Sequence, residues 1–434
     1  MAIPVSNWSE LDDNAKSALL ERPAVRSDVD ISAEVARIVA LVRDTGDTAI
    51  RELSQQLDSA HLESLRVSEH EMAAATAELG EGAIAAIDLA IANVRRFHEP
   101  QLPRPIFVET MPGVRCERIS HAIDSVGLYV PAGTAPLPST AIMLAVPAAL
   151  AECPTRILCT PPRPGGSADS AVLVAASRAG VVDIFKIGGA QAIAAMAYGT
   201  QSVPKVCKIF GPGNVWVTSA KTLVSTDPAG AAIDMPAGPS EVLVIADAEA
   251  SAEFVAADLL SQAEHGVDSQ VVLLTTSNDL ANNVQLEIER QLETLTRAGI
   301  AREALANSRL VVVDSIERAI EISNRYAPEH LLLQISNPRT AMAGIRNAGS
   351  IFVGRWSPEA VGDYCSGTNH VLPTYGYANS FSGLGVDQFM RQMTVQELTQ
   401  DGLAGLADTV ITLAGLEGLD AHAAAVRRRL GASE

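Results

Sequence analysis

The pattern of apolar and polar residues divides the chain into a helical beginning, an alternating middle and a helical end. Apolar residues recur at helical spacing in 31–57 and 70–99, and three prolines between 100 and 105 then end this region. Beyond about residue 380 helical spacing returns, and we expect no further strand there.

In the middle of the chain, short apolar runs alternate with amphipathic segments across short turns. Such alternation predicts parallel strands joined by crossover helices. The predicted strands of a first series are 125–131, 156–161, 181–188 and 205–212, and those of a second series are 241–247, 270–276, 309–315, 330–336 and 350–354. The helices expected in the second series are 251–264, 279–295, 315–326 and 337–347.

We therefore predict an α/β protein with two doubly wound, Rossmann-like parallel sheets facing a cleft, a helical N-terminal segment and a helical C-terminal tail. We expect an N-terminal arm at 1–24, one α/β domain at 126–239, a second formed by 25–125 with 240–380, and a tail at 381–434. A length of 434 residues suits this division, because single cores stop growing at about 250–300 residues.

Composition narrows the classes of function. The net charge is 32 − 51 = −19, which argues against a nucleic-acid binder, since such proteins need a basic face. The longest apolar run, 141–151, is too short to span a membrane, and we see no secretory signal. Five cysteines without a CxxC pair favour a reduced, cytoplasmic protein.

Three turns follow predicted strands and open predicted helices: the turn at Gly133 after Tyr129, Gly188–Gln191 and Gly211–Asn214. Helix N-termini at the carboxyl ends of parallel strands bind phosphate, so a dinucleotide is a reasonable ligand. The plain alternative is that each glycine only makes a tight turn. No GxGxxG or GxxxxGK[ST] motif is present.

Several polar side chains interrupt the apolar pattern at element ends. Gln262 and His265 share a helix face, Glu329 and His330 stand at a helix-to-strand junction, and the polar, Gly-rich stretch 362–378 includes Asp363 and His370. His422 follows Glu417 by five residues in the tail. An Asp, two His and an amide oxygen are able to bind Zn²⁺, and an adjacent acid and imidazole suit proton transfer. A solvated helix end, a capping pair and a surface histidine are the plain alternatives.

Long segments of the chain resemble the histidinol dehydrogenase family. The matching motifs are VGLYVPAGTAPLPST, KIGGAQAIAAMAYGT, KIFGPGNVWVTSAK, DMPAGPSEVLVIAD, LLSQAEHG, NRYAPEHL, GDYCSGTNHVLPTYGYA and RQMTVQELT, between Val126 and Thr399, with EGLDAH beyond them. The resemblance implies a zinc- and NAD-dependent enzyme that oxidises L-histidinol to L-histidine in two hydride transfers, the last step of histidine biosynthesis. It also implies a homodimer whose tail reaches the partner's site.

The resemblance also implies residue roles. The ligands of one zinc ion per subunit are Gln262, His265, Asp363 and His422; Glu329 and His330 transfer protons; the substrate contacts add Ser240, His370 and Glu417; and the NAD contacts are Tyr129, Gln191 and Asn214. In this scheme 126–239 binds NAD, while 25–125 and 240–380 form the substrate and zinc domain.

Two other functions compete with this one. An NAD-dependent aldehyde dehydrogenase would use a cysteine nucleophile, with Cys153 and Cys116 as candidates. Cys153 ends an apolar helix before Pro154, which is a poor setting for a reactive thiolate. A non-enzymatic metal-binding protein would keep the zinc ligands without needing Glu329 and His330.

Overall fold

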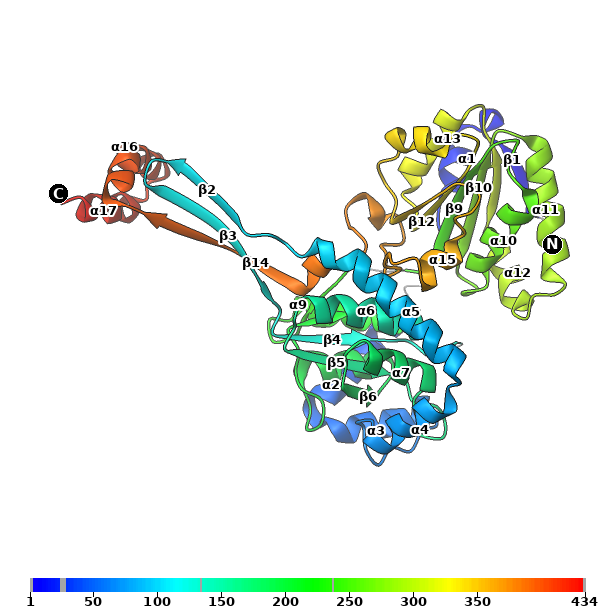
Figure 1. The fold of residues 1–434 in the computed structure, drawn as a ribbon, viewed down its shortest axis with the longest axis horizontal. Coiled ribbons are helices and arrows are strands. Elements are labelled where there is room, and N and C mark those ends of the chain that lie inside the picture. Colours follow the sequence, from blue (N-terminus) through cyan, green and yellow to red (C-terminus); the bar gives the residue numbers. More distant parts are fainter. Residues whose placement is uncertain (1–2, 24–28, 133–134, 236–237, 432–434) are drawn as a thin grey trace.

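Two parallel sheets, each covered by helices, and an arm that extends away from both make up the protein (Figure 1). The computed structural model describes residues 3–23, 29–132, 135–235 and 238–431. Within these ranges no helix combines the length and the apolar character that crossing a bilayer requires. The two parallel sheets confirm the predicted α/β class.

The first sheet, sheet A, has six parallel strands in the order β1-β11-β10-β9-β12-β13. Its strands are β1 (Val5–Asn7), β9 (Glu241–Ala246), β10 (Gln270–Thr275), β11 (Arg309–Val312), β12 (His330–Gln334) and β13 (Ser350–Val353). The helices around it are α1 (Asp13–Leu19), α10 (Ala252–Ala263), α11 (Asn278–Leu292), α12 (Ala298–Ala306), α13 (Ile316–Tyr326), α14 (Pro338–Ala341) and α15 (Glu359–Tyr364). Strands β9, β10 and β12 are buried at every residue, as expected for strands covered on both faces.

The second sheet, sheet B, has five parallel strands in the order β6-β5-β4-β7-β8. Its strands are β4 (Ser125–Tyr129), β5 (Thr155–Thr160), β6 (Asp183–Lys186), β7 (Lys208–Phe210) and β8 (Ala232–Ile233). Its crossover helices are α6 (Pro138–Leu150), α7 (Ser170–Arg178), α8 (Gly189–Tyr198) and α9 (Val215–Thr226). In sheet B the chain runs from β4 out to β6 and then returns past β4 to β7 and β8. In sheet A, apart from the edge strand β1, it runs from β9 out to β11 and then returns past β9 to β12 and β13, so both sheets are doubly wound as predicted.

The N-terminal helices cover sheet B, whereas we expected 25–125 to join 240–380. These helices are α2 (Val29–Thr45), α3 (Asp47–Leu57), α4 (Glu69–Glu78) and α5 (Glu81–His98). Apolar residues of α2 and α3 share one core with β4 and α8, and those of α4 and α5 share another with α6 and α7. Helical periodicity shows that a helix has an apolar face, but not which sheet that face covers.

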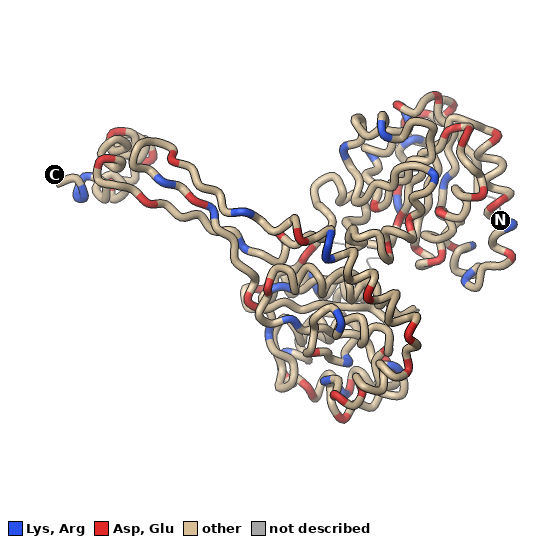
Figure 2. The backbone as a smooth tube through the Cα atoms, in the orientation of Figure 1, with Lys and Arg blue, Asp and Glu red and all other residues tan. Residues whose placement is uncertain are grey.

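The arm contains a third sheet, which the sequence pattern did not predict. Its antiparallel strands are β2 (Ile106–Met111), β3 (Val114–Ala122) and β14 (Met390–Leu398), and it carries α16 (Gln400–Glu417) and α17 (Asp420–Arg429). The expectation that no strand follows residue 380 was therefore wrong. Strand β14 pairs with β3, which lies far away in the sequence. Almost every residue of β14 is exposed, and both basic and acidic residues are spread along the arm (Figure 2). A short polar segment of this kind carries little periodic signal.

The fold brings opposite edges of the two parallel sheets together. Residues 234–240 lead directly from the carboxyl end of β8 to the amino end of β9. The polar stretch after α15 also bridges the two units: the side-chain amide of Asn369 donates to the carbonyl of Met143 at 2.8 Å, and that of Asn93 to the carbonyl of Cys365 at 2.9 Å. The carboxyl edge of sheet B therefore lies next to the amino edge of sheet A.

Candidate active site

Glu329 and His330 stand where α13 gives way to β12, as predicted. The helix ends at Ala327, whose φ of 52° is left-handed, and Pro328 prevents its continuation. Both side chains are buried, and Glu329 Oε2 lies 3.6 Å from His330 Nδ1. His330 Nδ1 also lies 3.2 Å from the backbone carbonyl of Glu241, which fixes the ring orientation.

Burial and mutual charge shift the proton affinities of this pair. Burial raises the pKa of Glu329 to about 8. Burial alone would lower the pKa of His330, but the carboxylates of Glu329, Asp363 and Glu359 outweigh it and raise that pKa to about 10. Paired titratable groups with strongly altered pKa values are typical of proton-transfer sites.

Two of the four predicted zinc ligands, His265 and Asp363, lie beside His330, and a third, Gln262, is buried one helical turn before His265. Gln262 and His265 lie at the end of α10, and Asp363 lies in α15. His265 Nε2 is 4.0 Å from Asp363 Oδ2, and Asp363 Oδ1 is 3.5 Å from His330 Nε2. Burial opposes ionisation of Asp363, but His330, His370 and His265 outweigh it and lower its pKa.

These residues fit a metal ion. Gln262 is 0 % exposed, yet neither its amide oxygen nor its amide nitrogen has a hydrogen-bond partner within the described ranges. Such an orphaned buried group is costly unless a ligand completes it. His265, Asp363 and the neighbouring Glu359 also place one possible ligand atom each within 4.8 Å of one another. Nitrogen and oxygen donors of this kind suit zinc.

Sequence reasoning missed three carboxylates around this centre. Glu359 is buried, accepts a hydrogen bond from Ser261 at 3.0 Å and lies 3.8 Å from His330 Nδ1; burial raises its pKa to about 8. Glu241 opens β9 and forms a buried ion pair with Arg22. Asp258 lies one helical turn before Gln262, and burial raises its pKa to about 7. Glu241 and Glu359 gave one available signal, an acid at the first position of a strand or helix, whereas Asp258 lies in the middle of α10.

Two predicted substrate contacts lie beside the same centre. His370 is close enough to Asp363 and His265 for their charges to interact, and its Nε2 is buried without a partner in the described chain. Ser240 directly precedes Glu241, and its carbonyl accepts a hydrogen bond from the backbone of Gln270. Both residues therefore border the amino edge of sheet A.

Glu417 and His422 are not brought to this centre by their own chain. They lie in α16 and α17, at the end of the arm farthest from both parallel sheets (Figure 1), and both are exposed. The fourth predicted zinc ligand is therefore remote from the other three within one subunit.

The predicted NAD contacts lie at the carboxyl edge of sheet B. Tyr129 ends β4, and its hydroxyl accepts a hydrogen bond from the Gly189 amide at 3.0 Å. Gln191 is buried in the first turn of α8, whereas Asn214 is exposed and caps α9 through the amides of Trp216 and Val217. The Gly133 turn lies outside the described residues.

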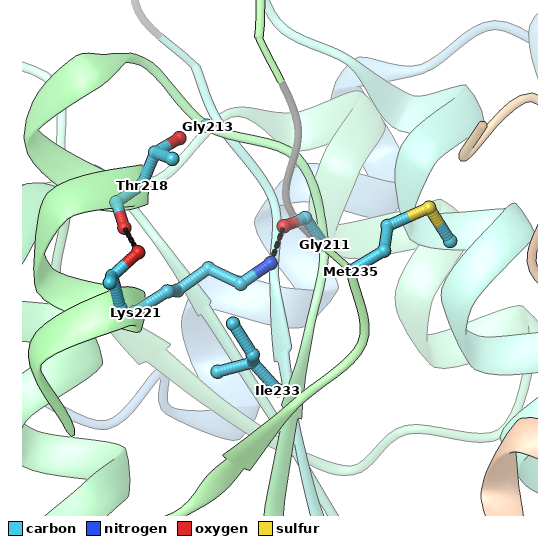
Figure 3. A pocket seen from close by; sticks show the side chains of 7 residues that line it. Gly211, Gly213, Thr218, Lys221, Ile233 and Met235 are labelled. Atoms are coloured by element: carbon cyan, nitrogen blue, oxygen red, sulfur yellow. Dashed lines mark hydrogen bonds between the residues drawn. The ribbon is translucent and has the colours of Figure 1, made fainter. Parts of the chain in front are cut away.

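Buried polar contacts of Lys221 hold the turn before α9, and Figure 3 shows its hydrogen bond to the Gly211 carbonyl. The ammonium group of Lys221 pairs with Asp234 and donates to the Gly211 carbonyl at 2.9 Å, while the Gly211 amide donates to Asp234 at 2.8 Å. A side chain at position 211 would meet the Tyr129 carbonyl at 2.1 Å, and φ there is +122°, so only glycine fits. The turn is thus rigidly held beside the end of β4.

Neither candidate cysteine nucleophile lies at these edges. Cys153 is fully buried after α6, where burial raises the pKa of its thiol to about 11, and Cys116 lies in the arm strand β3. A buried thiol with a raised pKa is a poor nucleophile. The geometry therefore does not support the cysteine-dependent alternative.

Comparison with known proteins agrees with this arrangement. The profile of the histidinol dehydrogenase family matches residues 20–430. The chain is 54% identical to the histidinol dehydrogenase of Vibrio cholerae, covering 98% of this chain and 97% of that protein, and 55% identical to that of Photobacterium profundum, covering 98% and 95%. A crystal structure of histidinol dehydrogenase from Elizabethkingia anophelis superimposes with a TM-score of 0.95 at 44% identity, covering 99% and 98% of the two chains. The chain therefore belongs to the histidinol dehydrogenase family of oxidoreductases.

Proposed function

We propose that this protein oxidises L-histidinol to L-histidine through the aldehyde, using two NAD⁺ and one zinc ion per site. The observation that carries the proposal is that His265 and Asp363 meet beside the buried Glu329–His330 pair, with the amide of Gln262, unpartnered in the described chain, one helical turn before His265. It is supported by the position of this centre next to the sheet edge that carries the expected NAD contacts.

Each group has a distinct task in this proposal. Gln262, His265 and Asp363 would hold zinc, which when bound supplies a fixed attachment point for the substrate's imidazole and amine. Bound NAD⁺ supplies the hydride acceptor for both oxidations. Ser240, His370 and Glu417 would contact and orient the substrate.

The buried acid and imidazole would move the protons. As the first hydride leaves the alcohol carbon, His330 in its neutral form would accept the hydroxyl proton. The surrounding carboxylates raise its proton affinity, so this form becomes more populated as the pH rises toward the pKa of about 10. Glu329 in its ionised form, which is favoured above its pKa of about 8, would then take a proton from water as that water adds to the aldehyde. The hydrate loses the second hydride and a proton and becomes the carboxylic acid.

We also propose that the active form is a homodimer in which the partner's arm completes each site. Large apolar side chains are exposed along the arm, namely Ile106, Phe107, Val108, Met111, Met393, Val395, Leu398, Leu413, Leu416 and Leu419. Exposed apolar surface of this extent is typical of an interface. Docked on a second copy, α16 and α17 would deliver Glu417 and His422 to the partner's ligand set.

The test is the stoichiometry of NADH formation by the purified protein. Two NADH should form per histidinol consumed, because conversion of an alcohol to an acid removes four electrons. Chelation should abolish turnover and added zinc should restore it. One NADH per histidinol with accumulating aldehyde would contradict the four-electron reaction, and zinc binding without any NADH would favour a non-enzymatic protein.

The unpaired state of all five cysteines supports our expectation of a cytoplasmic location.

A further inference from the structure

Two buried hydrogen-bond acceptors meet where β4 faces the start of α8. The Tyr129 hydroxyl already accepts the Gly189 amide. The side chain of Gln191 folds back over this turn, because a Cβ placed on Gly189 would lie 2.8 Å from Gln191 Oε1. Gln191 is 1 % exposed, and its Oε1 has no hydrogen-bond partner within the described ranges. The turn therefore presents an unsatisfied acceptor.

Asp58 brings a second unsatisfied acceptor to the same place from a distant part of the sequence. It follows α3, its amide donates to the Ser54 carbonyl at 3.0 Å, and the chain then turns sharply at Ser59, where φ is 53°. The Oδ2 atom of Asp58 is buried without a partner in the described chain. Its charge is close enough to Tyr129 to contribute to the raised pKa of that phenol.

A third polar group, unpartnered within the described ranges, is the hydroxyl of Ser54, which lies in α3 one helical turn before Asp58. Ser54 is fully buried, and its hydroxyl has no partner among the described residues. Burial also raises the pKa of Asp58 to about 6, since the carboxylate has lost water without gaining a donor. Apolar residues of α3, α8 and the end of β4 pack in one core, and three buried polar atoms without a partner in the described chain, Gln191 Oε1, Asp58 Oδ2 and the Ser54 hydroxyl, lie on or next to these elements.

The chemistry of these groups selects the part of a dinucleotide that fits them. A carboxylate only accepts hydrogen bonds, so it repels phosphate and attracts hydroxyl groups. Neighbouring hydroxyls occur on the riboses of NAD. Resting on the proposed function, we propose that Asp58, together with Gln191, binds the hydroxyl groups of the adenosine ribose of NAD and so excludes a cofactor with a 2′-phosphate.

The position on sheet B indicates which ribose is bound. Gln191 and Asp58 lie on the β4–β6 side, whereas the last strand at the other side, β8, is followed eight residues later by Glu241, which contacts Glu329 and His330. The nicotinamide must reach that centre, so the nicotinamide half lies toward β7 and the adenosine half lies toward β6. In other doubly wound proteins an acidic residue likewise binds the adenosine ribose, although there it follows a strand.

The test compares Asp58→Asn with Glu52→Gln, an exposed acid on the same helix. Binding of NAD and NADP is measured by calorimetry, alongside the KM for histidinol and thermal unfolding. Asp58→Asn should weaken NAD binding about tenfold or more, since it removes hydrogen bonds to a charged group. NADP binding should weaken less or improve, while the histidinol KM and the melting temperature should not fall. Glu52→Gln should match the wild type in every measurement.

The outcomes separate this inference from the proposed function. If wild type binds NAD and Asp58→Asn binds both cofactors with unchanged affinities, the assignment of Asp58 is wrong. A variant that loses NAD affinity only in proportion to lost thermal stability also overturns it, because a structural role explains that result. If wild type binds NAD and Asp58→Asn alters cofactor selectivity, but histidinol is not oxidised, the proposed function fails and the Asp58 assignment stands.

Discussion

Glu241 and Glu329 each accept a hydrogen bond from the other's backbone amide. Glu329 Oε2 is 2.9 Å from the Glu241 nitrogen, and Glu241 Oε1 is 3.2 Å from the Glu329 nitrogen. The exchange ties the start of β9 to the start of β12, so the backbone of sheet A itself positions the Glu329 carboxylate. Arg22 completes the arrangement through its ion pair with Glu241 and a hydrogen bond to the Tyr326 carbonyl at 2.7 Å.

Breaking the Arg22–Glu241 ion pair should therefore destabilise the protein. Arg22→Met leaves Glu241 as a buried charge without its cation, and we expect a loss of about 3–5 kcal/mol in the free energy of unfolding. Urea unfolding measures it. Arg37→Met is the matched control, because Arg37 pairs with Glu34 on the exposed surface of α2 and should leave stability unchanged. A loss no larger than that of the control would contradict the prediction.

Glu329 and His330 should fail at different steps. His330→Ala removes the acceptor of the alcohol proton and should slow histidinol oxidation about 10²–10⁴-fold. Glu329→Gln should mainly slow oxidation of the aldehyde, because hydration loses its base. Single-turnover measurements with histidinol and with histidinal separate the steps. Identical defects with both substrates would show that the two residues do not divide the work as proposed.

Asp258 should make stability depend on pH. Burial raises its folded-state pKa from 3.8 to about 7, so the folded state favours the protonated acid. Its contribution is present below the unfolded pKa and is lost as pH rises between about 4 and 7. Asp258→Asn keeps an acceptor for Gln334, which donates to Asp258 at 3.1 Å, but removes the charge.

The stability gained by Asp258→Asn should therefore grow from pH 5 to pH 7.5 and then level off. Three pKa units set an upper limit of about 4 kcal/mol for this gain. Thermal unfolding of the variant and of the wild type across this pH range measures their difference in stability. The other buried acids are present in both proteins, so their contributions cancel in this difference. A gain that is constant with pH would mean that Asp258 is already ionised in the folded state at pH 5.

Complementation should reveal a site shared between two chains. His265→Ala and His422→Ala should each be inactive alone. In a mixed dimer one site carries both substitutions and the other carries neither, so activity should return after subunit exchange, toward half that of a wild-type dimer. A control mixture of His265→Ala with Asp363→Ala should not recover, because both changes affect the same chain's ligands. Verified exchange without recovery would mean that each chain builds its own site.

Removing both candidate nucleophilic cysteines should leave turnover largely intact. The proposed route uses water and Glu329, and neither Cys116 nor the buried Cys153 lies at the sheet edges. Cys116→Ala with Cys153→Ala should keep the two-NADH stoichiometry, although the cavity at Cys153 should lower the melting temperature. Specific loss of aldehyde oxidation, with alcohol oxidation preserved, would instead favour a covalent thiohemiacetal.

Local patterns in the sequence were enough for the two parallel sheets and for most of the candidate site. Short apolar runs alternating with amphipathic segments predicted β9, β10 and β12, because strands buried on both faces need apolar residues at nearly every position. Pro328 located the junction at Glu329 and His330, because a proline after a helical pattern ends the helix whatever the distant surroundings are. The resemblance then supplied Gln262, His265 and Asp363; in the structure His265 Nε2 lies 4.0 Å from Asp363 Oδ2, and the buried Gln262 amide has no partner in the described chain.

Only the tertiary structure decided features that depend on partners far apart in sequence. Strand β14 exists because β3 pairs with it, and helices α2–α5 cover sheet B because their apolar faces fit its cores. Glu241, Glu359 and Asp258 became part of the candidate site only because folding buries them near His330 and Gln262. The amino-acid sequence alone does not show which acids will be buried. The proximity of the two sheets rests on contacts such as that of Asn369 with Met143, which no periodicity encodes, since periodicity reports a residue's local face and not its distant neighbours.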